Sequence, residues 1–382
     1  MVPPRPGSRR VAVPGGGVGV SNRLMPTVSD SARSAGLRLE RSRASRQFEG
    51  HGFRNTAPVG AGIQGSALPL LGEYFFGGTQ RTPPAPLPVD DPRGAWARAP
   101  DTGLRVTWLG HSTMLLEVDG ARVLTDPVFG DRVSPVSFAG PKRFHATPVP
   151  LDALPDLDAV LVSHDHFDHL CRSTIQALAK RRVPFVTALG VGRHLEAFGV
   201  APELITELDW WEEHRVGPVS FRAAPAQHFS GRGLGDRNKT LWASWVLTTD
   251  KHRLFFSGDT GLTPEFEEIG RRCGPFDLVM MEVGAFHPSW GSIHLGPENA
   301  LKAHAMLGGG TLMPVHWGTF NLALHAWDEP VETLVKLATE QQVRLFTPGL
   351  GRSLEPSRVE GVTPWWRDVG EPRLVAPAGA VT

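Results

Sequence analysis

The chain has 382 residues, of which 41% are hydrophobic, 20% are charged and 8% are aromatic. This composition is typical of a soluble globular protein, and it excludes collagen, a wholly disordered chain and a multi-span membrane protein. Lys plus Arg and Asp plus Glu both number 39, so the net charge is zero. A neutral chain has no general field that gathers nucleic acid, so we expect no nucleic-acid partner.

Cysteine and histidine usage favours nitrogen and oxygen ligands for any bound metal. The two cysteines, Cys171 and Cys273, lie far apart and outside any Cys-x-x-Cys pattern. This arrangement excludes both a disulfide framework and a thiolate zinc finger. The chain also has 15 histidines, several of them in one short segment. A metal would therefore be held by imidazole and carboxylate groups.

The composition divides the chain into four segments. Residues 1–48 are rich in Arg, Ser, Gly and Pro, which predicts a disordered tail. Residues 49–100 form an extension and linker that we expect to pack on the core. Their apolar patch at 68–76 is read first as core packing, with lipid contact as the alternative. The catalytic domain is expected over 101–354, and an irregular C-terminal tail over 355–382.

The N-terminal segment has a faint export motif. Ser8-Arg9-Arg10 resembles a twin-arginine signal, but Pro14 and three glycines interrupt the apolar stretch that follows. We therefore expect a cytoplasmic protein. No run approaches the ~20 apolar residues that span a bilayer, so any membrane contact would be peripheral.

Short apolar runs separated by Gly, Pro and Asp predict strands in both halves of the catalytic domain. The predicted strands cover 105–109, 114–118, 122–125, 159–162, 183–187, 219–224, 242–248, 253–257, 278–283 and 311–315. Helical patterns follow at 173–181, 193–198, 263–272, 297–306 and 330–341. Strands come early in each half and helices follow, which predicts two sheets packed face to face with helices outside.

The strongest chemical motif is the run from His164 to His169, which reads His-Asp-His-Phe-Asp-His and directly follows a predicted strand. In an extended segment residues i and i+2 point the same way, so His164 and His166 can hold one ion together. The turn into the next helix would bring Asp168 and His169 towards a second ion. Two adjacent metal sites are implied.

Four ligands cannot complete two coordination shells, so further ligands are expected at other strand ends. His228, Asp259 and His316 each lie just past a predicted strand. The seven candidate metal ligands are then His164, His166, Asp168, His169, His228, Asp259 and His316. Two carboxylates and a hydroxide offset three of the four charges of two divalent ions, which favours an anionic substrate.

These residues resemble the signature of the metallo-β-lactamase superfamily over roughly 104–354. Further segments resemble its N-acylphosphatidylethanolamine-hydrolysing phospholipase D branch: Thr107–Thr113, Thr125–Phe129, Gly140–Phe144, Glu207–Glu213, Phe266–Gly270, His316–Phe320 and, upstream, Phe53–Asn55. The resemblance implies an α+β fold, a four-layer αββα sandwich, with a centre of two zinc ions.

The resemblance also implies roles for the candidate ligands. One ion would be held by His164, His166 and His228, the second by Asp168, His169 and His316, and Asp259 would bridge them. Asp168, Asp259 and His294 are the catalytic candidates, with His294 as a hydrogen-bond donor or leaving-group acid and a structural histidine as its alternative. His and Asp ligands also accept Mn²⁺ or Fe²⁺.

Four nearby residues have two readings each. His111 could orient a ligand or be a hydrogen-bonded core histidine. Asp126 could brace a metal-binding histidine or start a turn. Lys142 and Arg143 could meet a phosphate, although a solvated surface is the preferred interpretation.

The expected function is hydrolysis of a phosphodiester, with N-acylphosphatidylethanolamine giving an N-acylethanolamine and phosphatidic acid. The alternative is hydrolysis of a soluble lactone or phosphorylated small molecule. Asp165 and Phe167 replace the Asn and Tyr of the family's lipid hydrolases, so the pocket is expected to differ. The expected partner is a phospholipid or another anionic small molecule. A peripheral membrane contact and a homodimer are compatible with the sequence.

Overall fold

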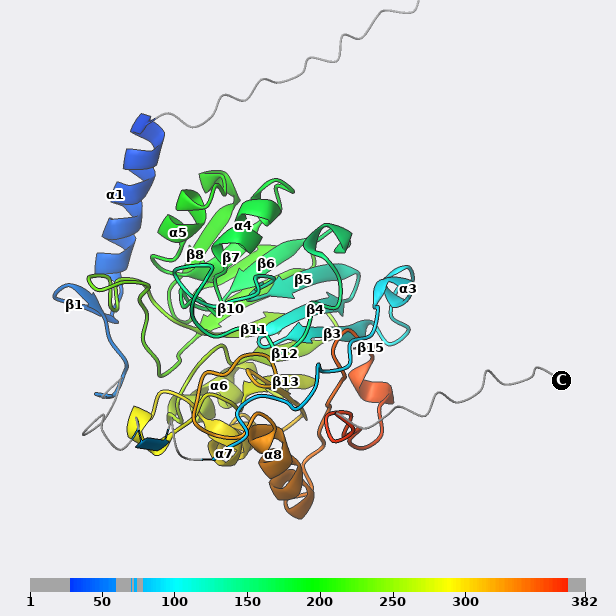
Figure 1. Cartoon of the computed structure of the whole chain (residues 1–382). Helices are drawn as coiled ribbons and strands as arrows, with labels where there is room; N and C mark the ends of the chain where they lie inside the picture. Colours follow the sequence, from blue (N-terminus) through cyan, green and yellow to red (C-terminus); the bar gives the residue numbers. More distant parts are fainter. Residues whose placement is uncertain (1–27, 60–69, 71, 74–77, 370–382) are drawn as a thin grey trace, which may run out of the picture.

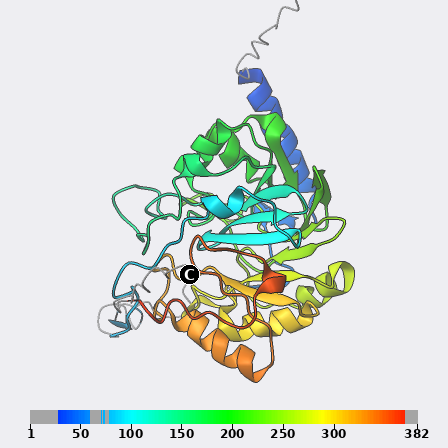
Figure 2. The same ribbon diagram turned by 90° about the vertical axis from the view of Figure 1, so that its right-hand side faces the viewer.

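The computed structural model describes residues 28–59, 70, 72, 73 and 78–369. Two mixed sheets pack face to face with helices on both outer sides (Figure 1), which confirms the predicted αββα sandwich. After a quarter turn, one group of helices lies above the sheets and a second group lies below them (Figure 2). None of the helices in the described part of the chain has the length and apolar character needed to cross a membrane.

The first sheet has the strand order β15-β3-β4-β5-β6-β7-β8. Its pairs are antiparallel from β15 to β5 and parallel from β5 to β8. The strands are β3 (Leu104–Gly110), β4 (Thr113–Val118), β5 (Ala121–Thr125), β6 (Ala159–Val162), β7 (Phe185–Ala188), β8 (Ile205–Leu208) and β15 (Ser353–Leu354). The helices α4 (Arg172–Ala179) and α5 (Gly192–Ala197) connect its parallel strands.

The second sheet has the order β14-β13-β12-β11-β10-β9, antiparallel from β9 to β12 and parallel from β12 to β14. Its strands are β9 (Glu213–Val216), β10 (Val219–Ala224), β11 (Ser244–Thr248), β12 (Arg253–Phe256), β13 (Leu278–Glu282) and β14 (Thr311–Val315). The helices α6 (Glu265–Cys273), α7 (Gly296–Met306) and α8 (Glu329–Glu340) accompany it. Short 3₁₀ turns lie at Leu151–Ala153, Pro202–Leu204, Pro288–Trp290 and Pro356–Arg358.

Continuous burial explains why the central strands read as apolar runs without strict alternation. Every residue of β3, β6, β13 and β14 is buried, because one face of each sheet meets the other sheet and the other face meets helices. The helix α6 instead buries one face, with Phe266, Ile269 and Cys273 turned inward. Its acidic first turn and basic last turn complement the helix dipole.

The helix α1 (Val28–Ala44) corrects the expectation of a disordered tail over residues 1–48. Arg38 forms ion pairs with Glu196, at 3.0 Å, and with Glu207. Arg41 donates to the Glu207 carbonyl oxygen at 2.7 Å. These contacts with α5 and β8 are tertiary, so the composition of the segment does not reveal them. Residues 1–27 lie outside the described residues.

The extension continues with the strands β1 (Phe48–Glu49) and β2 (Gly52–Phe53), which form a small hairpin, and the short helix α3 (Arg93–Trp96). The Trp96 indole is buried and donates to Thr107 Oγ1 at 3.0 Å, which places the short helix against β3. Most of the apolar patch at 68–76 lies outside the described residues.

The described part of the C-terminal segment, up to residue 369, packs closely on the domain. The Trp366 side chain is 1% exposed, and its indole donates to Glu332 Oε1 at 2.7 Å. Glu355 accepts hydrogen bonds from the backbone of Asp101 and Thr102 at 3.0 and 2.8 Å. The segment therefore ties the end of the chain to the start of the catalytic domain.

Candidate metal centre

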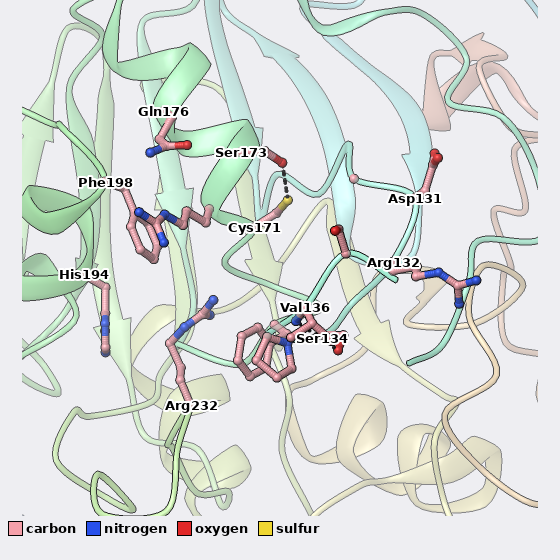
Figure 3. Close-up of a pocket in the computed structure, with 15 residues that line it drawn as sticks. Asp131, Arg132, Ser134, Val136, Cys171, Ser173, Gln176, His194, Phe198 and Arg232 are labelled. Atoms are coloured by element: carbon pink, nitrogen blue, oxygen red, sulfur yellow. Dashed lines mark hydrogen bonds between the residues drawn. The ribbon is translucent and has the colours of Figure 1, made fainter. Parts of the chain in front are cut away.

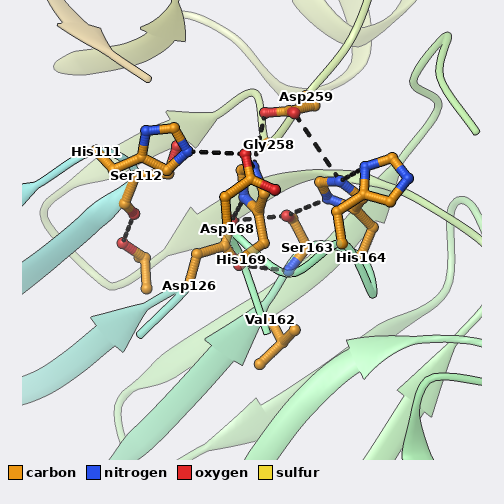
Figure 4. Close-up of polar contacts among 12 residues, drawn as sticks. His111, Ser112, Asp126, Val162, Ser163, His164, Asp168, His169, Gly258 and Asp259 are labelled. Carbon is orange, nitrogen blue, oxygen red and sulfur yellow. Dashed lines mark hydrogen bonds and ion pairs between the residues drawn. The ribbon is translucent and has the colours of Figure 1, made fainter. Parts of the chain in front are cut away.

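The structure brings all seven predicted metal ligands together at one rim of the sandwich. The run from His164 to His169 follows β6, His228 follows β10, Asp259 follows β12, and His316 follows β14. The loops after β6 and β12 meet at this rim, as the close-up of His164, Asp168, His169 and Asp259 shows (Figure 4). Three groups of four side chains result, and two of them hold all seven candidates: His164, His166, His228 and Asp259, and His111, Asp168, His169 and His316. The third joins Asp259 and His316 to Glu282 and His294.

Three ring nitrogens meet in the first group. His164 Nε2 lies 2.9 Å from His166 Nδ1, and His228 Nε2 lies 3.3 Å from the same nitrogen. The His228 Nδ1 atom lies 2.9 Å from the Ile293 carbonyl oxygen, which only accepts, so this nitrogen carries the proton. The Nε2 of His228 therefore presents a lone pair.

His164 is oriented by the same logic. The Ser163 hydroxyl donates to Asp126 Oδ2 at 2.6 Å and so accepts from His164 Nδ1 at 3.0 Å. Burial lowers the pKa of both His164 and His228 well below the ordinary value, so both rings are neutral. A divalent cation between these nitrogens would satisfy the lone pairs that His164 and His228 turn toward one another.

Asp168 is the meeting point of the second group. Its Oδ2 atom lies 3.3 Å from His316 Nε2 and 3.5 Å from His169 Nε2. The other nitrogen of His169, Nδ1, donates to Asp126 Oδ2 at 2.7 Å, so the His169 Nε2 atom faces the group unprotonated when the ring is neutral.

Asp259 lies between the two groups. Its Oδ1 atom is 3.1 Å from His169 Nε2, and its Oδ2 atom is 3.2 Å from His316 Nε2 and 3.7 Å from His228 Nε2. Asp259 Oδ1 and His169 Nε2 are nevertheless buried atoms with no hydrogen-bond partner. Buried polar atoms are rarely left unsatisfied, so this donor set fits a pair of divalent cations better than a set of hydrogen bonds.

The backbone also allows Asp259 to reach this position. Gly258 precedes it with φ +54°, and a Cβ atom there would lie 2.8 Å from the Ser163 Cβ. Only glycine fits both the left-handed conformation and the close approach to the loop after β6.

The two carboxylates of the centre, Asp168 and Asp259, attract positive charge to the space between them. Burial alone would raise the pKa of Asp168 and Asp259, but the neighbouring imidazoles lower both well below the ordinary value. Burial alone would lower the pKa of His316, but Asp259 and Asp168 raise it to about 10. Both carboxylates are therefore ionised and attract protons or metal cations to the facing nitrogens.

Asp126 and His111 each contact a candidate ligand. Asp126 is fully buried and holds the Nδ1 atom of His169, which supports the bracing interpretation. The His111 Nε2 atom lies 3.1 Å from Asp168 Oδ2 in a buried setting, a contact that fits both of its readings. Burial and the nearby His316 lower the pKa of His111 to about 3.

Arg143 is the clear correction near the site. The sequence interpretation places it on a solvated surface, but the side chain is buried and its Nη2 atom donates to the Val128 carbonyl oxygen at 2.5 Å. Burial lowers its pKa to about 10. Lys142, beside it, is exposed as expected.

Glu282 is a site residue that the sequence reasoning missed. It is fully buried, its Oε1 atom accepts from the backbone N–H groups of Thr260 and Leu295 at 2.9 and 3.2 Å, and its Oε2 atom lies 3.0 Å from His294 Nδ1. Burial alone would lower the pKa of His294, but the neighbouring Glu282 carboxylate outweighs this effect and raises the pKa above its ordinary value. Glu282 is the last residue of β13 and lies inside the predicted strand 278–283, so the search for ligands just past each strand did not reach it.

A pocket of about 300 Å³ opens above the two groups. His294 lines it, 4.0 Å from Asp259 Oδ2, together with the candidate ligands. Its other walls are apolar and consist of Phe229, Ala285, Trp290, Ile293 and Leu322. The pocket thus combines a charged floor with apolar walls.

Asp165 and Phe167 point away from this pocket. Asp165 accepts from the Gly231 N–H at 2.8 Å and from Thr240 Oγ1 at 2.9 Å, so it anchors the loop that follows β10. The Phe167 ring faces the Arg232 guanidinium, 4.0 Å from it, and lines a second pocket. Asp165 and Phe167, which replace the Asn and Tyr of the lipid hydrolases, therefore change the structure outside the metal-facing pocket and not within it.

Comparison with known families identifies the chain. The Beta-lactamase superfamily domain matches residues 121–317, which hold all seven candidate ligands. The chain belongs to this superfamily. Its hydrolases with this fold use a divalent metal, in agreement with the two groups of side chains. An uncharacterized protein of Mycobacterium tuberculosis, Rv0906, is 48% identical over 292 residues, which cover 75% of this chain and 77% of the relative.

Two named relatives share a smaller part of the chain. The N-acyl-phosphatidylethanolamine-hydrolyzing phospholipase D 1 of Caenorhabditis elegans is 38% identical over 58% of this chain and 65% of its own length. The mitochondrial enzyme of the same name in Saccharomyces cerevisiae is 34% identical over 65% of this chain and 55% of its own length.

The solved structures establish likeness of fold. An isothiocyanate hydrolase from Delia radicum gut bacteria superposes with a TM-score of 0.54 at 24% identity, over 66% of this chain and 98% of that protein. Igni18, a metallo hydrolase of Ignicoccus hospitalis, does so with a TM-score of 0.52 at 20% identity, over 66% of this chain and 97% of that protein.

Proposed function

We propose that the protein is a two-zinc phosphodiesterase of the phospholipase D type, which hydrolyses N-acylphosphatidylethanolamine to an N-acylethanolamine and phosphatidic acid. The observation that carries the proposal is the pair of ligand groups joined by Asp259 beneath a pocket with apolar walls. The similarity to the nematode and yeast phospholipases D supports the substrate class.

The chemistry of the donor set supports a hydrolase that acts on an anion. One zinc ion would be held by His164, His166, His228 and Asp259, and the other by Asp168, His169, His316 and Asp259. A bound pair of divalent cations supplies Lewis acidity that activates water and stabilises the charged oxygens of a phosphodiester. The two ionised carboxylates offset only part of the charge of two such cations, so the centre retains an attraction for a phosphate group.

The other residues of the pocket have separate tasks. Phe229, Trp290, Ile293 and Leu322 form walls that an acyl chain can contact while the phosphate faces the ligand groups. Cleavage joins a water oxygen to phosphorus and breaks the bond from phosphorus to the ethanolamine oxygen. The departing oxygen then needs a proton. His294 lines the pocket with its Nδ1 atom held by Glu282, which leaves Nε2 as the free nitrogen that can deliver one.

A substrate panel on purified, metal-quantified protein tests the proposal. We expect about two equivalents of zinc per chain, release of N-acylethanolamine from N-acylphosphatidylethanolamine vesicles, loss of turnover on chelation and its return with zinc. Phosphatidylcholine and a phosphorylated lactone are the control substrates. A metal-replete enzyme that opens the lactone and leaves the N-acylated lipid intact would show that the soluble-substrate alternative is correct.

A further inference from the structure

A hairpin between β5 and β6 carries apolar side chains into solvent. Arg132 and Lys142 pair as an antiparallel bridge, and the Arg143 N–H donates to the Asp131 carbonyl oxygen at 2.9 Å. Residues 131–142 therefore project as one ordered unit. At its tip Phe138 is 82% exposed and Val136 is 39% exposed. An aromatic ring this exposed contributes little to the core, and together with Val136 it forms an apolar tip that is free to contact a partner.

A second loop, residues 231–239, presents a further apolar side chain. Leu234 is fully exposed at its tip. The loop is nevertheless held firmly, because the backbone N–H groups of Arg232 and Gly233 donate to Asp236 Oδ1 at 3.1 and 2.8 Å, and that of Gly231 donates to Asp165. Leu234 is thus displayed by an ordered loop.

The hairpin 131–142 and the loop 231–239 border the same pocket, which has a volume of about 600 Å³ (Figure 3). Ser134 to Ser137 line it from the hairpin, and Arg232 lines it from the loop. Arg172 also lines it, at the start of α4. The two segments contain five basic and two acidic residues, in a chain whose net charge is zero. Positive charge is therefore concentrated around exposed apolar tips.

This surface adjoins the metal centre on two sides. Phe167 lines the pocket and lies between His166 and Asp168 in the chain, so its ring is attached to the loop that carries the candidate ligands. The Arg237 guanidinium lies 5.0 Å from the ring of Phe229, which lines the metal-facing pocket. A molecule held at the surface is therefore close to the site of hydrolysis.

We propose that the hairpin 131–142 and the loop 231–239 form a docking surface for a bilayer that contains anionic phospholipid. Phe138, Val136 and Leu234 would enter the interface, and Arg132, Lys142 and the neighbouring guanidinium groups would contact lipid phosphates. Charge complementarity favours this occupant, and separate protruding tips suit a lipid interface better than a closely fitting protein surface. The inference rests on the proposed lipid substrate for its purpose, but the surface is tested by binding alone.

Vesicle flotation of the full chain provides the test. We expect the wild-type protein to float with phosphatidylcholine vesicles that contain about 30 mol% phosphatidylglycerol and to bind pure phosphatidylcholine vesicles more weakly. The double variant Val136→Asp/Phe138→Asp should bind the anionic vesicles about tenfold more weakly or worse. The matched control is Leu37→Asp/Leu39→Asp on α1, whose side chains are 55% and 47% exposed; it should bind as the wild type does.

A charge variant and a conservative variant separate the contributions. Lys142→Glu/Arg172→Glu should weaken binding to anionic vesicles and reduce its dependence on salt, whereas Lys251→Glu, on a distant turn, should not. Phe138→Trp should retain binding. Melting temperature and metal content show that each variant is folded.

Two outcomes would overturn the docking surface. The first is wild-type protein that does not float with anionic vesicles, or a hairpin variant that floats as well as the wild type. The second is a hairpin variant that converts a dimer to a monomer without changing flotation, which would assign the surface to a second copy of the chain. Flotation does not depend on turnover. A protein that binds anionic vesicles but does not cleave the lipid would therefore contradict the phosphodiesterase proposal and leave the docking surface standing.

Discussion

The side chain of Asp126 sets which nitrogen of His169 faces the metal centre, so Asp126→Asn should disable one of the two sites. In the wild-type protein Asp126 Oδ2 accepts from His169 Nδ1 at 2.7 Å, and Asp126 Oδ1 accepts from the Ser163 N–H at 2.7 Å. An asparagine can offer an oxygen to only one of these donors. If the amide nitrogen faces His169, it forces the ring proton onto Nε2, the atom that faces Asp259.

The structure sets the size of the effect. Asp126 and His169 are both 0% exposed, so water cannot replace the lost interaction. Loss of a carboxylate behind a metal-binding histidine typically costs 10–100-fold in affinity, or about 1.4–2.8 kcal/mol. Only the group that contains His169 should be weakened. If the amide oxygen faces His169 instead, the buried Ser163 N–H is unpaired, and the free energy of unfolding should fall by ~1–3 kcal/mol.

Competition with a graded series of chelators, followed by metal quantification, measures the effect. We expect two equivalents of zinc in the wild-type protein and one tightly held equivalent in Asp126→Asn. Asp158→Asn is the matched control, because Asp158 also accepts from a backbone N–H, that of Arg122 at 2.8 Å, in an exposed setting. If Asp126→Asn keeps both equivalents against the same chelators and unfolds at the wild-type denaturant concentration, the assigned tautomer of His169 is wrong.

Three other substitutions test the centre and its surroundings. Asp259→Ala should reduce bound metal to less than about one equivalent and turnover by about a hundredfold or more, because one carboxylate serves both groups; metal analysis that finds two equivalents would contradict the bridging position. Glu282→Gln keeps the hydrogen bonds from the backbone N–H groups of Thr260 and Leu295 but replaces the carboxylate beside His294 Nδ1 with an amide. We expect kcat to fall about tenfold with little change in KM. An unchanged kcat would show that His294 takes no part in the reaction. Burial and the nearby Arg143 lower the pKa of His145 to about 3, so the folded state favours the neutral ring and loses stability as the pH falls below ~6.5. Between pH 6.5 and 5 the free energy of unfolding, measured with urea, should therefore fall by ~2 kcal/mol less in His145→Gln than in the wild type. Equal falls in the two proteins would contradict the burial argument.

The centre illustrates how far local sequence can predict a functional site. His164, His166, Asp168 and His169 could be grouped in advance, because a short segment after a strand fixes where its side chains point. His228, Asp259 and His316 could be added because loops that follow strands of packed sheets converge on one rim. Glu282 lies inside the predicted strand 278–283 and not in the loop after it, and a single carboxylate at the end of an apolar strand has no local partner that marks it.

The supporting residues depended on contacts between distant segments. Asp126 could be read as a turn residue until its carboxylate was seen against His169, 43 positions later. Arg143 carries a charge and therefore suggests a surface, yet the Val128 carbonyl oxygen accepts its guanidinium in the interior. Periodicity and composition describe neighbours along the chain, so they contain no information on such pairs.

The length and spacing of the apolar runs determined the two sheets and their outer helices, because a buried strand or helix face needs apolar residues in its own segment. The His and Asp residues after these runs determined the class of metal ligand. Tertiary structure alone decided the rest. The helix α1 is ordered by ion pairs from Arg38 to Glu196 and Glu207, although its own composition favours disorder. The hairpin 131–142 and the loop 231–239 meet at one pocket only after the sheets pack. Long-range contacts of this kind gain their energy from the folded arrangement itself, so no segment encodes them on its own.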